Sequence, residues 1–190
     1  RVAAKNLRNG ERNELAWRRK PLSEDEILAA PYLNYPLTQY MYCAPDEGAA
    51  AVVLCRSDIA RTYHDTPITL AASVLRTRRE GGFEMQSPSV PLLGTPSPTV
   101  DASRAAFEIA GVEPSDVGVA QLQDTDAGSE IMHMAENGFC ADGDQEKLIA
   151  EGYTEITGAL PVNTDGGLIA NGEPIGASGL RQIYEVVLQM

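Results

Sequence analysis

The chain has 190 residues, 43% of them hydrophobic, and a formal net charge of −12 at pH 7. This length fits one domain, or a large part of a bigger protein, with a buried core. The acidic balance argues against non-specific nucleic-acid binding, and no run approaches the roughly 20 apolar residues of a membrane span.

The sequence also gives an expectation for the cellular compartment and for bound metals. No signal-peptide pattern is visible at the start, and the three cysteines predict neither a disulfide framework nor a metal site. We therefore expect a cytoplasmic protein without a bound metal. The chain begins without Met and stops inside a helical pattern, so we also expect it to be part of a longer protein.

The first 20 residues carry seven basic side chains against two acidic ones, although the whole chain is acidic. A segment of this kind either holds a small polyanion such as a nucleotide phosphate or forms a solvated surface, which is the more frequent case. After it, Ser23 with Glu26 three residues later predicts a capped helix that ends before Pro31.

The middle of the chain reads as strands and loop. Small and β-branched residues at 49–54 predict a buried strand, and the run 68–75 predicts a second strand. Four prolines between residues 81 and 99 predict a loop.

From residue 101 onward, short helices and strands alternate, which indicates an α/β layered domain. Asp101 is expected to cap a helix that stops at Gly111, and residues 117–122 are expected to form a strand. Helices are also predicted over 127–137, over 144–151 and from about Ala177, the last with an apolar stripe of Leu180, Ile183, Tyr184, Val187 and Leu188.

A glycine-rich loop between residues 160 and 182 leads into that last helix. Glycines admit positive φ and close approach of a ligand, and a helix start presents free N–H groups that can hold an anion or a carbonyl oxygen. Its candidate substrate-binding residues are Asn163, Gly166, Gly167, Asn171, Gly172, Gly176 and Ser178.

This loop resembles the C-terminal signature of the thiolase superfamily, N-x-x-G-G followed by G-H-P-x-G-A-S/T-G. Residues 43–54 resemble a second family motif, C-x-P-x-x-D/E-G-A-A-A. Within the superfamily the segment from Lys5 to Glu26 is similar to the lipid-transfer and sterol-carrier-protein X branch. In the family, a helix followed by G-V/I-x-P-x-D leads into a strand at the opening of the C-terminal half, and Gly111, Val112, Pro114 and Asp116 match this pattern.

The resemblance implies a layered α-β-α-β-α fold built from two similar halves. Residues 1–100 would supply the end of the N-terminal half with its loop region, and 101–190 most of the C-terminal half. It also implies that the nucleophilic cysteine of the family lies outside this chain, so that Cys43, Cys55 and Cys140 are buried or structural.

Two acidic residues are the candidate catalytic groups. Glu173 stands where thiolases carry the histidine of the G-H-P motif, and a carboxylate there could act as a base or be a structural position. Asp124 follows the predicted strand 117–122, where α/β sites usually form, and matches an acidic position of the lipid-transfer branch. A strand-end Asp is also a common helix cap, and Asp126 could be one.

The resemblance implies a protein that acts on acyl-CoA or sterol-derived CoA thioesters, by cleavage of a carbon–carbon bond or by acyl transfer. No tightly bound cofactor is implied, since the coenzyme A thioester is the substrate. A homodimer is implied, and a small OB-fold protein is a possible further partner. The alternative is a non-catalytic thiolase-fold subunit that binds a CoA ester or scaffolds a partner.

Overall fold

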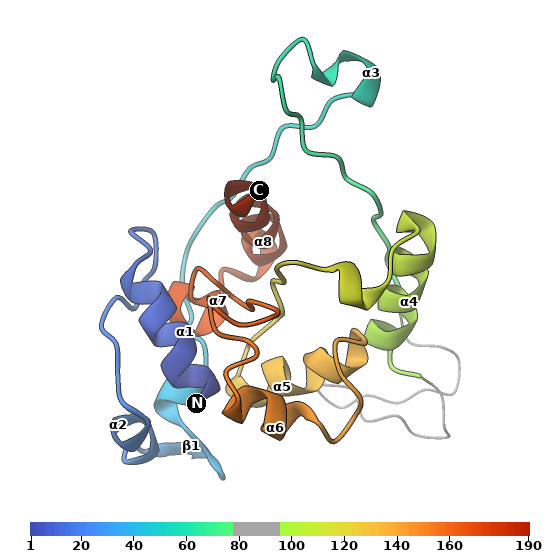
Figure 1. Cartoon of the computed structure of the whole chain (residues 1–190). Helices are drawn as coiled ribbons and strands as arrows, with labels where there is room; N and C mark the ends of the chain where they lie inside the picture. The colour runs from blue at the N-terminus through green and yellow to red at the C-terminus, as the bar shows by residue number, and fades with distance from the viewer. Residues whose placement is uncertain (78–95) are drawn as a thin grey trace.

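A computed structural model of the chain describes residues 1–77 and 96–190, in which helices and extended segments form the body and one small antiparallel sheet lies at the edge beside α2 (Figure 1). Strands β1 and β2 pair with Tyr32 opposite Thr38. The elements, in chain order, are α1 (Val2–Glu11), α2 (Glu24–Leu28), β1 (Tyr32–Asn34), β2 (Leu37–Thr38), the 3-10 helix η1 (Gln39–Met41), α3 (Ser57–Ala60), α4 (Pro98–Ala110), the 3-10 helix η2 (Pro114–Asp116), α5 (Ala127–Glu136), α6 (Gln145–Ala150), α7 (Gly167–Asn171) and α8 (Ile175–Gln189).

Most residues of helix α1 are buried, although its segment is rich in basic residues. It packs against α7, α5 and α2, and Figure 1 shows α1 and α7 side by side. Leu7 is 1% exposed, and Ile169 of α7 is fully buried beside it in the same core cluster. The contact is close because Gly10 has no side chain: a Cβ there would lie 2.4 Å from the Cβ of Ala170.

A second core cluster joins α5 to two extended segments. The backbone of Ala120 makes an isolated parallel bridge to Val162, with N–H···O distances of 3.0 Å on both sides of the bridge. Met134 of α5 and Val162 are both fully buried in this cluster. The segment 117–122 is therefore extended, as predicted, but it forms this single bridge rather than a ladder.

Local signals in the sequence predicted several helix ends correctly. Ser23 and Glu26 form the complete capping box of α2. Asp126 caps α5, where its side chain accepts hydrogen bonds from the N–H groups of Gly128 and Ser129. Gly111 ends α4 in the left-handed conformation that glycine adopts most easily.

Two helix starts differ from the prediction. Helix α4 begins at Pro98 and is capped by Ser97, because proline suits the first helical position and the serine hydroxyl accepts from the N–H of Val100. The expected cap, Asp101, lies within the helix. Helix α8 begins at Ile175 rather than at Ala177. Most of the loop predicted over 81–99 lies outside the described residues.

The strands predicted at 49–54 and 68–75 do not form, and the first is not buried. Val53 is 97% exposed and Leu75 is 84% exposed. Both segments extend away from the body of the molecule towards α3 (Figure 1). A strand needs a neighbour for its N–H and C=O groups, and no segment in the described part of the chain pairs with either of them.

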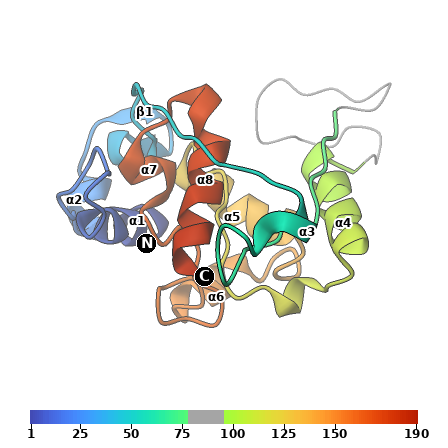
Figure 2. The same cartoon turned by 90° about the horizontal axis from the view of Figure 1, so that it is seen from above.

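Helix α8 turns its polar face inward. It lies between the α1–α7 pair and α4 in both views (Figures 1 and 2). Ser178 and Glu185 are buried, whereas Leu188 on the predicted apolar stripe is 61% exposed. The expectation that this stripe faces a core is thus wrong for the described residues, because polar partners on the 163–165 segment occupy the inner face.

Replacing Gly10 tests the α1–α7 contact. We expect Gly10→Ala to lower the free energy of unfolding by about 1–3 kcal/mol, because overpacking outweighs the better helix propensity of alanine. Gly118→Ala is the matched control, since a Cβ at that position meets no atom within 4 Å. Urea unfolding of the full-length protein measures both, and equal stabilities for the two variants would contradict the close contact.

Candidate active site

The carboxylate of Asp124 is fully buried beneath the start of α7. Its Oδ1 accepts a hydrogen bond from the N–H of Leu168 at 2.6 Å, and its Oδ2 accepts from the N–H of Ile169 at 3.2 Å. The Asn6 side chain donates to the same Oδ2 at 2.8 Å. Gly167 makes room for this arrangement, because a Cβ there would lie 2.2 Å from Oδ2.

A second carboxylate, that of Glu130 on α5, is also fully buried and is the centre of a polar network. The ammonium group of Lys5 lies 2.5 Å from its Oε1 and donates to the carbonyl of Val162 at 2.9 Å. The side-chain amides of Asn6 and Asn163 donate to its Oε2 at 2.8 and 2.7 Å. Glu130 therefore joins α1, α5 and the loop before α7.

Asn163 holds the predicted loop from inside. It is fully buried and has a φ of 53°, in the left-handed region that asparagine tolerates better than most residues. Its Oδ1 accepts from the N–H of Leu122 at 2.9 Å, and its carbonyl accepts from the Asn9 side chain at 3.0 Å. These contacts fix the segment 117–122 against the glycine-rich loop.

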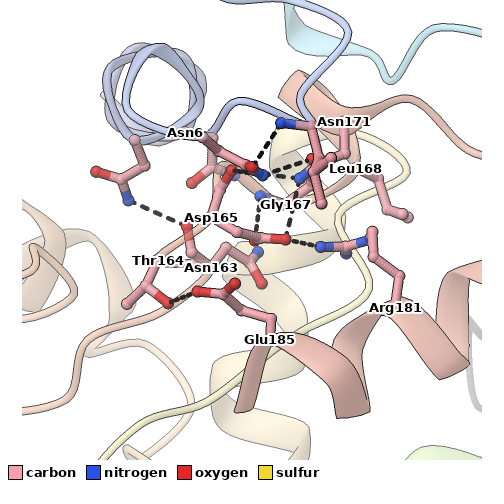
Figure 3. A network of polar contacts seen from close by, with 12 residues as sticks. Asn6, Asn163, Thr164, Asp165, Gly167, Leu168, Asn171, Arg181 and Glu185 are labelled. Atoms are coloured by element: carbon pink, nitrogen blue, oxygen red, sulfur yellow. Dashed lines mark hydrogen bonds and ion pairs between the residues drawn. The ribbon is translucent and has the colours of Figure 1, made fainter. Parts of the chain in front are cut away.

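Asn171 and Asp165 close the same loop (Figure 3). The Asn171 amide donates to the carbonyl of Gly167 at 2.7 Å and to Asp165 Oδ2 at 3.1 Å. Arg181 of α8 forms an ion pair with Asp165, and Glu185 accepts from the Thr164 hydroxyl at 3.0 Å. The inner face of α8 is thereby tied to the loop.

The electrostatics of the buried network are unbalanced, because Lys5 pairs with Glu130 and Asp124 forms no ion pair with any of the described residues. Burial is the main cause that raises the pKa of Asp124 well above its ordinary value, and repulsion from Glu130 adds to it. The two backbone N–H groups and Arg181 oppose the shift. Asp124 thus binds its proton more tightly in the folded protein than in the unfolded chain.

Glu173 lies at the edge of this network and is partly exposed. Its Oε1 accepts a hydrogen bond from the side-chain amide of Gln123 at 2.5 Å, and its Oε2 accepts from the thiol of Cys43 at 3.4 Å. Its backbone N–H donates to the carbonyl of Ala44 at 2.9 Å. Each carboxylate oxygen is thus oriented by a donor from a different chain segment, Gln123 for Oε1 and Cys43 for Oε2.

Cys43 is held as a neutral thiol at this site. Burial, the nearby Glu173 carboxylate and the hydrogen bond to it raise the pKa of Cys43 to about 12, against a smaller lowering effect of Arg18. Since the thiolate is the reactive form of cysteine, Cys43 in this environment is a hydrogen-bond donor and not a nucleophile.

The predicted site residues fall into three places. Asp124, Asn163, Gly166, Gly167 and Asn171 gather in the buried network, and Gly172 and Glu173 follow at its edge, with Gly172 buried beside Asp46. Gly176 and Ser178 lie on the first turns of α8. Gly176 is exposed, whereas Ser178 is 2% exposed and its hydroxyl has no hydrogen-bond partner in the described part of the chain.

Several members of the site were missed by the sequence reasoning. A buried lysine and a buried glutamate look like surface residues in a sequence, and their contacts join positions more than one hundred residues apart. The only local signal was the match of Lys5 and Asn6 to a family segment. The missed residues are Lys5, Asn6, Gln123 and Glu130, together with Cys43, which had been assigned a structural role; Arg18 belongs to the basic segment for which a contact with a nucleotide phosphate was considered.

Two further properties concern the described residues only. They contain no group of three or more His, Cys, Asp or Glu side chains that could hold a metal ion. Nor does any helix in residues 1–77 and 96–190 have the length and apolar character needed to cross a membrane.

Comparison with known proteins defines the family. The family model described as "Thiolase C-terminal domain-like" matches residues 89–190, more than half of the chain. The chain therefore belongs to the thiolase family and has a thiolase-like α/β fold, as its loop signature predicted. This result fixes the class of protein, although the histidine position of the signature is occupied by Glu173.

Individual relatives agree with this assignment. Over its full length the chain is 32% identical to an acetyl-CoA acetyltransferase of Methanothermobacter thermautotrophicus and 29% identical to the benzoylsuccinyl-CoA thiolase subunit BbsB of Thauera aromatica, covering 48% of each. It is 28% identical to sterol carrier protein 2 of Bos taurus, with 98% of this chain and 34% of that protein covered. The chain thus spans about half the length of its first relatives, or less.

A solved structure shares the fold. The protein titled "Ltp2-ChsH2(DUF35) aldolase" superposes with a TM-score of 0.77 at 21% sequence identity, covering 98% of this chain and 48% of that one. At this identity the likeness establishes the common fold.

The Lys5–Glu130 pair yields a stability prediction. We expect Lys5→Met to lower the free energy of unfolding by about 3–5 kcal/mol, because it leaves the Glu130 carboxylate buried without its cation. Arg8→Met is the control: its pair with Glu155 is 49% and 40% exposed at the two side chains, and exposed pairs contribute about 0–1 kcal/mol. Denaturant unfolding that gives similar losses for both variants would refute the central role of Lys5.

The raised pKa of Asp124 predicts a pH dependence. In the folded state Asp124 keeps its proton to higher pH, so its stabilising contribution is complete below the unfolded value of about 3.9 and is lost as pH rises through the folded value. Asp124→Asn cannot titrate. The stability of the natural protein relative to this variant should therefore fall as pH rises from about 4, as measured by urea unfolding at several pH values. If the stability of the natural protein instead rose with pH relative to Asp124→Asn, the assigned direction of the pKa shift would be contradicted.

Proposed function

We propose that the full-length protein is a cytoplasmic enzyme that acts on acyl-CoA or sterol-derived CoA thioesters, with Glu173 contacting the reacting part of the substrate. The observation that carries the proposal is the placement of Glu173. It is a partly exposed carboxylate with both oxygens oriented by side-chain donors, next to a buried and fully bonded loop. The thiolase family membership supports a CoA thioester as the substrate.

Carbon–carbon cleavage suits this group better than acyl transfer. In cleavage of a 3-hydroxyacyl-CoA, Glu173 would take the proton of the 3-hydroxyl group while the C2–C3 bond breaks. The hydroxyl carbon becomes a carbonyl, and the bonding electrons pass to C2 to form the enolate of the shortened thioester, which then takes up a proton. Such a step needs a base and an oriented substrate, and no thiolate.

Acyl transfer would need a nucleophilic thiolate, and Cys43 does not supply one because its pKa is raised to about 12. A nucleophile outside these residues would have to serve instead. The relative named a benzoylsuccinyl-CoA thiolase subunit keeps acyl transfer as a candidate, and the structural neighbour named an aldolase supports cleavage as a class of reaction.

We assign the buried loop residues a positioning role. Asp124 and Asn163 have their oxygens engaged by backbone N–H groups and by asparagine side chains, so they would act by holding the loop. Gly166, Gly167 and Asn171 belong to the same support. Gly172 directly precedes Glu173, and Gly176 and Ser178 follow it on the first turns of α8. We propose that these three residues shape the approach of the thioester.

The experiment is an assay of the full-length protein on a 3-hydroxyacyl-CoA and, in parallel, on a 3-ketoacyl-CoA with free coenzyme A. We expect Glu173→Gln to lower kcat for cleavage by about 10²–10⁴-fold, the usual contribution of a general base. Glu47→Gln, which alters an exposed carboxylate of the neighbouring segment, should leave kcat unchanged. Strong thiolysis that survives Glu173→Gln would eliminate the proposed role.

A non-catalytic role is the second candidate, and the exposed apolar surface supports it. Ile183, Val187 and Val53 are 43%, 42% and 97% exposed, which is typical of a surface that another polypeptide covers. The partner would be a second copy of the protein or a small OB-fold protein. Binding of a CoA ester without turnover of either substrate would favour this alternative.

A further inference from the structure

Arg18 is held rigidly by backbone groups next to the Glu173 site. Its own N–H donates to the carbonyl of Ala170 at 2.7 Å. Its side-chain Nη1 donates to the carbonyl oxygens of Tyr42 and Ile169 at 2.7 and 3.1 Å. The guanidinium carbon lies 5.8 Å from the centroid of the Tyr40 ring. The side chain is therefore fixed before any ligand arrives.

The positive charge of Arg18 has no carboxylate partner in the part of the chain that the structure describes. Within residues 1–77 and 96–190 it forms no ion pair, and the two carbonyls that bind Nη1 are neutral. Burial is the main cause that lowers the pKa of Arg18, and the nearby Cys43 and Tyr40 oppose it. A half-buried cation without a counter-ion is an energetically poor arrangement unless an anion binds to it.

One edge of the guanidinium remains available. The Nε and Nη2 groups of Arg18 make no hydrogen bond to the described residues, and the residue as a whole is partly exposed. In Arg181, by contrast, the same two nitrogens are fully buried. The Nε and Nη2 donors lie side by side in the guanidinium plane and match the two oxygens of a carboxylate or phosphate.

The position of this edge connects it with Glu173. Tyr42, which accepts from Arg18, directly precedes Cys43, whose thiol donates to Glu173. The guanidinium of Arg18 is therefore fixed on the backbone carbonyl of the residue next to Cys43. Arg19, the next residue, is exposed and makes none of these contacts.

We propose that the free edge of Arg18 binds an oxyanion of the substrate: a carboxylate on the acyl group where Glu173 contacts the reacting atoms, or a phosphate of coenzyme A where the nucleotide end of the substrate occupies this place instead. The identity of the substrate rests on the proposed function, whereas the binding of an oxyanion rests on Arg18 alone. Of the basic residues near the start of the chain, Arg18 is thus the one with a ligand role, and its neighbour Arg19 belongs to the solvated surface.

Calorimetry on the full-length protein separates the two sources of the oxyanion. The ligands are acetyl-CoA, succinyl-CoA, coenzyme A and pantetheine. If Arg18 binds an acyl carboxylate, the natural protein prefers succinyl-CoA over acetyl-CoA by about tenfold or more, and Arg18→Met abolishes the preference. If Arg18 binds a phosphate, Arg18→Met weakens the binding of coenzyme A by about tenfold or more and leaves the binding of pantetheine unchanged.

Three controls make the result decisive. Arg19→Met should bind all four ligands like the natural protein. Arg18→Lys keeps the charge but lacks the two-donor edge, so it should lose most of the affinity that Arg18→Met loses. Circular dichroism checks that each variant is folded. If both Arg18 variants bound every ligand as tightly as the natural protein does, the proposal would be overturned. If only Arg18→Lys folds, an unchanged affinity of that variant alone would overturn it.

A readout without coenzyme A distinguishes this proposal from the proposed function. The side-chain Nε–H signal of Arg18 in ¹⁵N NMR should shift on titration with acetate or inorganic phosphate, and should be absent from the Arg18→Lys spectrum. A shift together with no binding of any CoA ester would refute the proposed substrate class but sustain the oxyanion site. No shift with either anion would refute the site.

Discussion

The ion pair between Glu130 and Lys5 is the interaction on which the rest of the structure depends. Both side chains are almost completely buried, and an isolated charge in such surroundings is far too costly to keep. The carboxylate is therefore tolerable only when α1, α5 and the loop before α7 meet in one arrangement. Lys5 supplies the cation, and the amides of Asn6 and Asn163 satisfy the remaining oxygen. Whatever its net stabilisation, the pair selects one register for α1.

The second buried carboxylate follows from that register. Asn6 bridges Glu130 and Asp124, donating to one oxygen of each. Asp124 in turn accepts the first N–H groups of α7, which would otherwise lack partners in the interior. Because the loop ahead of Glu173 is fixed from beneath in this way, Glu173 emerges from a rigid base at the point where the network reaches solvent. Rigid support of this kind is what a reacting group needs.

The sequence could predict the parts of this structure that depend on near neighbours. The capping box of Ser23 and Glu26 and the cap at Asp126 need only three or four residues. The glycine signature predicted the family and the fold class. The pairing of the segment 49–54 could not be predicted in the same way, because small β-branched residues indicate an extended chain but not the presence of a partner strand.

The contacts that join the candidate site to α1, α5 and the segment around Cys43 are long-range, which explains why sequence reasoning found only part of the site. Cys43 and Glu173 are 130 positions apart, and Lys5 and Glu130 are 125 apart. A cysteine that does not match the nucleophile of the family reads as a buried or structural residue, and a lysine in a basic segment reads as a surface residue. Only the folded chain reveals that the first donates to Glu173 and the second neutralises a core carboxylate.

The two faces of α8 differ in character and in what they contact. The inner face is polar and bonded to the 164–165 segment through Glu185 and Arg181. The outer face is apolar and uncovered in the described part of the chain, with Leu188 61% exposed. Support of the loop and cover of the apolar face are therefore separated on one helix. The first is complete within the described residues, whereas the second needs a surface outside them. Under the proposed cleavage, the exclusion of water that carbanion chemistry favours would likewise have to come from the substrate or from another polypeptide.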